Sequence, residues 1–87
     1  MATMILQHKV RDYAAWRPVY DAHEASRVRA GITNGRVYRK AEDANDIVIL
    51  FDAADVAKAR SWSSSEDLAT ALRKAGVRGT PAIHFIG

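Results

Sequence analysis

The stretch DIVILFDA, residues 46–53, is the most apolar run in the chain and decides how the remaining segments are interpreted. Both alternating sets of its side chains are apolar: one side of a strand carries Val48 and Leu50, and the other carries Ile47, Ile49 and Phe51. Such a strand suits the centre of a sheet. The helices of one short chain can cover only one face, and monomeric proteins avoid exposing a large apolar patch. The run therefore predicts a symmetric homodimer in which the second face packs against its copy.

Two strands and a helix are expected before this run. TMILQHKV (residues 3–10) alternates as a strand. DYAAWRPVYDAHEASRVRAG (residues 12–31) places aromatic and polar residues three and four apart, which predicts a helix that Asp12 caps. Pro18 predicts a kink in this helix or a helix that begins only after Trp16. ITNGRVYRKA (residues 32–41) predicts a second strand with a bulge at its Asn-Gly pair.

Two helical segments and a short strand are expected after the run. DVAKARSW (residues 55–62) predicts one helix, and SSSEDLATALRKAG (residues 63–76) predicts another. Ser63 and Glu66 have the spacing of a capping box at the start of the second helix. AIHFI (residues 82–86) predicts a last strand at a sheet edge, because a proline precedes it.

The resulting order is strand, helix, strand, strand, helix in two pieces, and strand, in a single domain over residues 1–87. This βαββαβ order predicts a ferredoxin-like α+β fold, with a four-stranded antiparallel sheet and its helices on one face. Chains of this size bury a small core, and such cores often gain stability by sharing surface with a second copy. The order therefore supports the same homodimer.

Composition disfavours several classes of function. The net charge is +3, but the basic residues are scattered, which favours a solvated surface over nucleic-acid binding. The chain has no cysteine, which fits a reducing compartment and excludes a thiolate site. Its first residues lack the features of a signal peptide, and no stretch is long enough to span a membrane. We therefore expect a cytoplasmic protein with no membrane partner.

The sequence resembles small members of the dimeric α+β barrel superfamily, and in particular the antibiotic-biosynthesis-monooxygenase-like group, which includes uncharacterised proteins labelled as cyclases. The resemblance rests on HKVRDYAAW (residues 8–16), on YDAH (residues 20–23), and on the serine-capped second helix that ends in AGV (residues 75–77). It covers nearly the whole chain. It implies a dimer whose sheets face each other, and a largely apolar cavity between sheet and helices in each subunit.

The resemblance implies several chemistries, because the superfamily hosts unrelated activities. Some members oxidise aromatic polyketides without metal or flavin, and others isomerise lactones, cyclise polyketides or degrade haem. Trp62 lies where haem-degrading and some oxygenase members carry a pocket tryptophan, but Leu72 stands where a haem degrader has its iron-ligating histidine. Little would hold haem iron without that imidazole. We expect Trp62 to be a core or pocket-wall residue, and we expect no cofactor and no metal.

The helix over residues 12–31 supplies one candidate site. His23 follows Tyr20 by three residues and precedes Arg27 by four, so all three share a face. A neutral imidazole could act there as a general base, and Arg27 could stabilise an enolate or a carboxylate. The alternative is a half-buried His23 bonded to a carboxylate, with Arg27 in solvent.

The first and last strands supply a second candidate pair. Because these strands are expected to be adjacent, His8 and His84 could be neighbours and form a polar handle in an apolar pocket. A catalytic metal normally takes three protein ligands, and no third ligand is evident. The candidate catalytic bases are therefore His23 and His84. The expected ligand pocket comprises Tyr20, Arg27, Tyr38, Trp62 and His8.

Two hypotheses for function remain open. The first is a homodimeric, cofactor-independent enzyme, resembling monooxygenases and cyclases, that binds an apolar or aromatic small molecule. It would abstract a proton from an acidic carbon before oxidation, isomerisation or cyclisation. The second is a ligand-binding or interaction module without turnover. A closed, purely apolar pocket would favour the second hypothesis, whereas a roomy cavity in which an imidazole meets a tyrosine or an arginine would favour the first.

Overall fold

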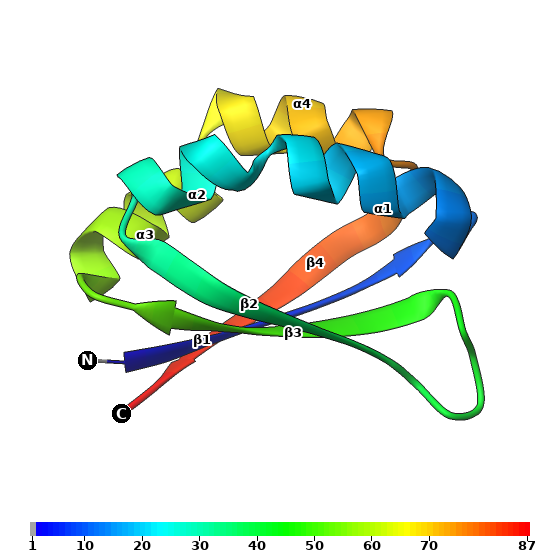
Figure 1. The fold of residues 1–87 in the computed structure, drawn as a ribbon, viewed down its shortest axis with the longest axis horizontal. Coiled ribbons are helices and arrows are strands. Elements are labelled where there is room, and N and C mark those ends of the chain that lie inside the picture. Colours follow the sequence, from blue (N-terminus) through cyan, green and yellow to red (C-terminus); the bar gives the residue numbers. More distant parts are fainter. Residues whose placement is uncertain (1) are drawn as a thin grey trace.

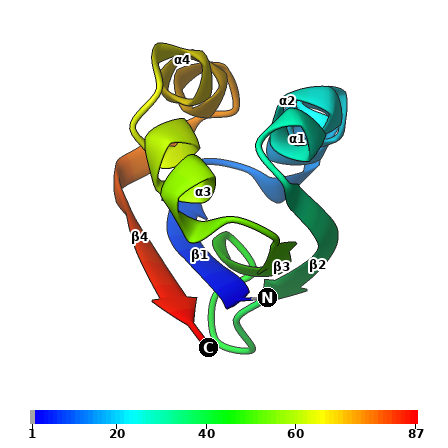
Figure 2. The same ribbon diagram turned by 90° about the vertical axis from the view of Figure 1, so that its left-hand side faces the viewer.

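A computed structural model describes residues 2–87 and shows a layer of helices over one face of an antiparallel sheet (Figure 1). The elements, in chain order, are β1 (Ala2–Val10), α1 (Tyr13–Ala22), α2 (Glu24–Arg29), β2 (Ile32–Arg39), β3 (Asp46–Ala53), α3 (Val56–Ser63), α4 (Glu66–Lys74) and β4 (Val77–Ile86). The strand order is β2-β3-β1-β4. Figure 2 shows, end-on, that the helices all lie on the same side of the curved sheet. The predicted ferredoxin-like α+β arrangement is confirmed.

The strand register confirms the predicted places of the strands in the sheet. β3 lies between β2 and β1, and β1 pairs antiparallel with both β3 and β4. The β2–β3 register shifts between Thr33 and Arg36, and Asn34 there has a φ of 54°, so the predicted bulge is present. A second shift lies between Gln7 and Lys9, where β1 pairs with the edge strand β4.

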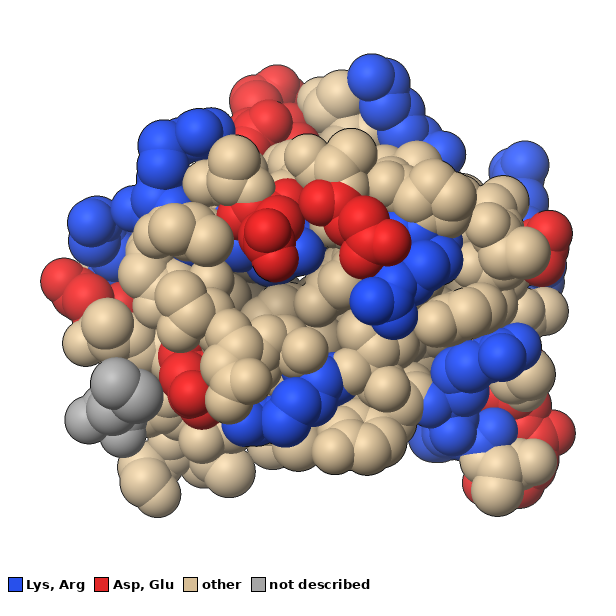
Figure 3. Space-filling view, viewed as in Figure 1, with Lys and Arg blue, Asp and Glu red and all other residues tan. Residues whose placement is uncertain are grey.

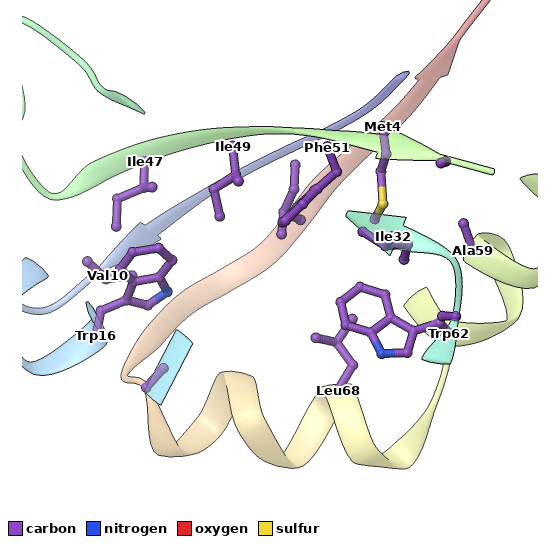
Figure 4. Packing of buried hydrophobic residues seen from close by; sticks show 14 residues of the cluster. Met4, Val10, Trp16, Ile32, Ile47, Ile49, Phe51, Ala59, Trp62 and Leu68 are labelled. Atoms are coloured by element: carbon purple, nitrogen blue, oxygen red, sulfur yellow. The ribbon is translucent and has the colours of Figure 1, made fainter. Parts of the chain in front are cut away.

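The hydrophobic core lies between the helices and one face of the sheet, which we call the covered face. Met4, Ile47 and Phe51 on this face are almost completely buried. Trp16 from α1 packs beneath Ile47, and other helical side chains complete the layer (Figure 4). The side chains of this core are Met4, Leu6, Val10, Trp16, Ala30, Ile32, Ile47, Ile49, Phe51, Ala53, Ala59, Trp62, Leu68 and Ala75.

The other face of the sheet has no helix over it, and we call it the open face. Val48 and Leu50 of β3 are only partly buried there. Tyr38 is 54% exposed, and Ile86 is 51% exposed. The prediction that the helices of one chain cover only one apolar face of β3 is therefore confirmed. Within residues 2–87, none of the helices has the length and apolar character needed to cross a bilayer.

The first helical segment is interrupted at a different place from the one predicted. Asp12 caps α1 by accepting a hydrogen bond from the amide of Ala14 at 3.2 Å, as expected. Pro18 lies inside α1, which continues past it to Ala22. Pro18 has no amide hydrogen, so the carbonyl of Ala14 loses its hydrogen bond within the helix. Ala14 is exposed, and water can donate to this carbonyl instead. The interruption lies instead at His23, between α1 and α2.

Two other boundaries also differ from the prediction. Ser65, not Ser63, caps α4 and accepts a hydrogen bond from the amide of Leu68 at 3.1 Å. The helix therefore begins at Glu66, and the predicted capping box is wrong: Glu66 is the first residue after the cap, whereas a capping box needs Glu or Gln at the third, which is Leu68. β4 begins at Val77 rather than after Pro81: Pro81 lies between Arg78 and Ala82, where the register of β4 against β1 shifts, and an irregularity in an edge strand tolerates a proline.

Candidate functional site

A small apolar cavity lies between the covered face of the sheet and the helices, and we call it the inner cavity. Its volume, measured as the space open to the centre of a water-sized sphere, is ≈ 30 Å³. That is enough for about two water molecules. Five of the seven residues that the sequence predicted for the site line it: His8, Tyr20, His23, Arg27 and Trp62. Leu6, Trp16, Val19, Ile49, Phe51, Leu68, Ala71, Leu72 and Ala75 complete the lining.

The other two predicted residues, His84 and Tyr38, lie on the open face. His84 pairs with Ile5, and Tyr38 pairs with Val48, so both side chains point away from the helices. The prediction that His8 and His84 are neighbours is wrong: the two strands are adjacent, but the histidines are on opposite faces. Strand order alone does not fix register, and a shift of one residue exchanges the two faces.

His8 is a buried polar side chain without a hydrogen-bond partner. It is 5% exposed, and neither ring nitrogen has a partner within the described residues. Its ring meets that of Trp16 edge-on, with 5.7 Å between centroids. Burial lowers the pKa of His8 to about 4, against a smaller opposing effect of Asp46, so the ring is neutral at pH 7. An unsatisfied buried polar group costs roughly 1–3 kcal/mol, and a polar atom of a ligand could bond to this one.

His23 belongs to a chain of hydrogen bonds that joins three helical segments, which we call the Asp67 network. The Nε2 atom of His23 lies 3.0 Å from Oδ2 of Asp67 in α4. The same oxygen accepts a hydrogen bond from Oγ of Ser26 at 2.5 Å, and Nε1 of Trp62 donates to Ser26 at 3.0 Å. Hydrogen bonds from Ser26 and His23 hold the pKa of the Asp67 carboxyl below its ordinary value.

The Asp67 network gives His23 a defined orientation. A carboxylate only accepts, so the tautomer assigned from this partner carries its proton on Nε2 and leaves Nδ1 with a free lone pair. A carboxylate that orients an imidazole and stabilises its protonated form is the arrangement that supports general bases in hydrolases. The predicted alternative of a half-buried His23 bonded to a carboxylate is therefore realised in part. Arg27, however, is not in solvent.

Arg27 is a buried cation stacked on aromatic rings. Arg27 is 6% exposed. Its guanidinium carbon lies 4.0 Å from the ring centroid of Tyr20 and 5.8 Å from that of Phe51. Nη1 donates to the backbone carbonyl of Tyr20 at 2.8 Å. Burial lowers the pKa of Arg27 and raises that of Tyr20. Among residues 2–87, no carboxylate oxygen lies within 4.0 Å of this guanidinium.

A larger hollow, which we call the outer cleft, opens beside the inner cavity. Its volume on the same measure is ≈ 340 Å³, and it runs between α1, α2 and the start of β2. Figure 3 shows this side of the molecule, with acidic and basic side chains gathered around the hollow. Tyr20, Arg27 and Phe51 line both spaces. These three side chains are therefore the wall between them.

Besides the apolar lining, two polar residues that orient His23 and Trp62 were missed from the sequence, Ser26 and Asp67. A signal for Ser26 was present, because it follows His23 by three residues and so shares its helical face. Asp67 lies 44 residues from His23, and nothing in the spacing connects them. In the described part of the chain, no three His, Cys, Asp or Glu side chains are grouped to hold a metal ion.

Comparisons with known proteins establish the fold. No family model matches the sequence, and no curated protein matches it significantly. Among solved structures, the chain is similar to a candidate antibiotic biosynthesis monooxygenase from Bordetella bronchiseptica, with 15% identity, coverage of 99% of this chain and 94% of that one, and a TM-score of 0.81. It is also similar to SnoaB, a cofactor-independent oxygenase from Streptomyces nogalater, with 20% identity, coverage of 95% and 89%, and a TM-score of 0.70. A third is Rv0793 from Mycobacterium tuberculosis, with 15% identity, coverage of 99% and 92%, and a TM-score of 0.69.

Identities this low establish the fold and leave the activity to be argued from the side chains. All three structures match over nearly their whole length as well as over nearly all of this chain. The chain therefore has the fold of solved antibiotic-biosynthesis-monooxygenase-like proteins, which confirms the fold implied by the resemblance seen in the sequence.

Proposed function

We propose that the protein is a cofactor-independent enzyme that binds an apolar or aromatic small molecule in the inner cavity, with His23 as its general base. The observation that carries this proposal is that His23, oriented by Asp67, lines the same apolar cavity as the unpartnered His8. A few convergent polar groups in an otherwise apolar cavity are typical of small-molecule sites. The likeness to SnoaB, described as a cofactor-independent oxygenase, supports the same class of chemistry.

The proposed chemistry starts with transfer of a proton from an acidic carbon of the ligand to Nδ1 of His23. Asp67 stabilises the imidazolium that forms, and the bound carbanion keeps the electron pair of the broken C–H bond. In an oxygenase reaction, that electron pair forms a C–O bond to molecular oxygen, and the peroxide takes the proton back from His23. Loss of water from the peroxide, with the second hydrogen of the same carbon, leaves a carbonyl group. The sum is CH₂ plus O₂ giving C=O plus H₂O.

His8 has a separate place in this proposal. Its neutral ring lines the cavity, so it would hold a hydroxyl or carbonyl group of the ligand by a hydrogen bond. A bound ligand would thereby satisfy a polar group that has no partner among residues 2–87. A group with a pKa of about 4 is a weak base at neutral pH, so we give His8 a positioning role rather than the role of the base.

We also propose that two copies assemble through their open faces. These faces present Val48 and Leu50 from the central strand, together with the exposed Tyr38 and Ile86. Packing the two faces together would remove this apolar surface from water, and a symmetric dimer uses the same patch on both copies. The inner cavity would then lie on the far side of each sheet from the interface. The cytoplasmic location expected from the sequence stays a prediction.

The test of the activity is oxygen-dependent turnover of anthrone-type and naphthol substrates, followed by absorbance. We expect His23→Ala to lower kcat by about 100-fold or more, since a positioned base contributes roughly 10²–10⁴-fold. Asp67→Asn should lower kcat and shift the pH profile, because the orienting carboxylate is lost. His84→Ala, on the open face, is the matched control and should turn over as the parent does. Undiminished turnover by His23→Ala would remove the proposed base.

A binding module without turnover is the second candidate, and the small volume of the inner cavity favours it. Ligand cavities usually measure about 300–1,000 Å³, so an aromatic molecule must displace side chains to enter. Fluorescence of Trp16 and Trp62, which both line the cavity, would report binding of 2-naphthol. Quenching without oxygen uptake, for every substrate in the panel, would support the module over the enzyme.

A further inference from the structure

We propose that Arg27 binds a carboxylate of the ligand, so that the molecule taken up through the outer cleft is an aromatic or apolar carboxylic acid in its anionic form. This inference rests on the proposed function of the inner cavity and names the class of molecule that it accepts. In this inference Arg27 binds a carboxylate that is already charged in the free ligand, and not an enolate that forms only during the reaction.

The first step of the argument is that Arg27 is a buried cation without a counter-ion. Arginine is almost never fully buried unless it is paired, because removing a charge from water without compensation is costly. Arg27 is 6% exposed, and within residues 2–87 one of its five N–H groups is bonded, to the backbone carbonyl of Tyr20. A guanidinium presents its N–H groups as a planar fork that matches the two oxygens of a carboxylate.

The second step is the position of Arg27 between the two spaces. The guanidinium lies over the ring of Tyr20 and near that of Phe51, and all three side chains line both the inner cavity and the outer cleft. A ligand whose carboxylate meets Arg27 can therefore direct its apolar body toward the inner cavity. The aromatic rings of Tyr20 and Phe51 are placed to contact that body.

The third step concerns the other charges around the outer cleft. Arg17 and Asp21 pair with each other at 3.1 Å, which leaves Glu24 as the acidic side chain of the cleft lining without an ion pair. Glu24 is exposed and forms no ion pair with Arg27. Its charge is screened by water, so it weakens anion binding at Arg27 without preventing it. Removing this charge should therefore strengthen binding of an anion.

The test compares two probes of nearly the same shape, 2-naphthoate and the uncharged 2-naphthamide. Binding is measured by tryptophan fluorescence and by calorimetry with the full chain. We expect the parent protein to bind 2-naphthoate at least 10-fold more tightly than 2-naphthamide. Arg27→Met should lose this preference, Arg27→Lys should keep part of it, and Glu24→Gln should raise 2-naphthoate affinity about 2-fold at low salt. Arg17→Met is the matched control, because it removes a neighbouring arginine of the same cleft, and it should keep the preference.

The outcomes separate this inference from the function on which it rests. Equal affinity for the two probes, or an unchanged preference in Arg27→Met, would overturn the role of Arg27 while the inner cavity remained a binding site. Failure of both probes to bind the parent would overturn the proposed cavity function and this inference together. If Arg27→Met does not fold, Arg27→Lys and Glu24→Gln decide the matter, because unchanged 2-naphthoate affinity in both would contradict the proposal.

Discussion

The two faces of the sheet carry similar side chains in very different surroundings. On the covered face, Met4 and Ile47 are 0% exposed, whereas Tyr38 and Ile86 on the open face are more than half exposed. The difference comes from the helices, which pack on one side only (Figure 1). Packing explains every apolar residue of the covered face, so the polar residues that remain there need another explanation.

His8 and His84 make this comparison with one residue type on two adjacent strands. His8 is buried on the covered face with no hydrogen-bond partner in the described part of the chain, and His84 lies exposed on the open face. Water can satisfy the second ring but not the first. A histidine therefore indicates a site when it is buried without a hydrogen-bond partner, and not by its residue type alone. Natural sequences keep such unsatisfied buried polar groups mainly at functional positions.

The largest expected effect separates the two faces within β3. Phe51→Ala should lower the free energy of unfolding by roughly 3–5 kcal/mol, since it removes a buried ring from the covered face and leaves a cavity. In the lone subunit, Leu50→Ala, at the adjacent position on the open face, should cost about 1 kcal/mol, because its side chain is partly in water there. Urea denaturation at a protein concentration too low for the proposed dimer to form measures both. Equal losses would show that the open face is as deeply buried as the covered face.

The second effect is a dependence of stability on pH that comes from His8. Its pKa in the folded chain, about 4, lies below the ordinary value of 6.5 for histidine, so the unfolded chain takes up the proton first as pH falls. The free energy of unfolding should therefore fall by about 3 kcal/mol between pH 6.5 and pH 4, and this contribution is fully present above pH 6.5.

Two variants test that assignment. His8→Leu should flatten the pH dependence of stability across this window, because no imidazole remains on the covered face. His84→Leu removes a histidine from the open face and should leave the slope as it is in the parent. A slope that survives in His8→Leu would show that another group carries it.

The sequence was sufficient for the elements and their order because those depend on local periodicity and capping. The apolar character of both side-chain sets in residues 46–53 predicted that β3 is central in the sheet, and the proline of the last strand predicted that β4 is at an edge. The errors concern positions where several residues could do the same local task. Ser63 and Ser65 are both serines that could cap a helix, but α3 continues to Ser63, which leaves Ser65 to cap α4.

The site was predictable where one helical face carried it. Tyr20, His23 and Arg27 share a face by their spacing, and all three line the inner cavity. His84 and Tyr38 were misplaced because the face of a strand residue depends on register, which bulges shift. Asp67 was missed because its contact with His23 joins helices that are distant in sequence and meet only in the folded chain.

A smaller change in stability, with a large change in assembly, is expected for Leu50→Glu. The substitution places a charge at the centre of the open face, where a lone subunit would tolerate it at a cost of about 1–2 kcal/mol. Sedimentation at micromolar concentration should show a dimer for the parent and a monomer for the variant, since the second copy would have to bury that charge. Circular dichroism checks that the fold is kept. A parent protein that sediments as a monomer contradicts the proposed assembly.

The smallest expected effect is at Arg27. In a residue chosen only for stability, replacing a buried side chain that stacks on two rings would be costly. Arg27→Met, however, removes an unpaired charge along with one hydrogen bond and the cation–π contact with Tyr20, so we expect the free energy of unfolding to stay within about 1 kcal/mol of the parent. Arg27→Ala should be less stable than Arg27→Met, because it leaves a cavity as well. Thermal unfolding of the two variants measures the difference. A loss of several kcal/mol in Arg27→Met would mean that the guanidinium stabilises the packing of α2 on the sheet. A near-neutral result would mean that folding does not require the guanidinium, as expected if its role is to bind the carboxylate of a ligand.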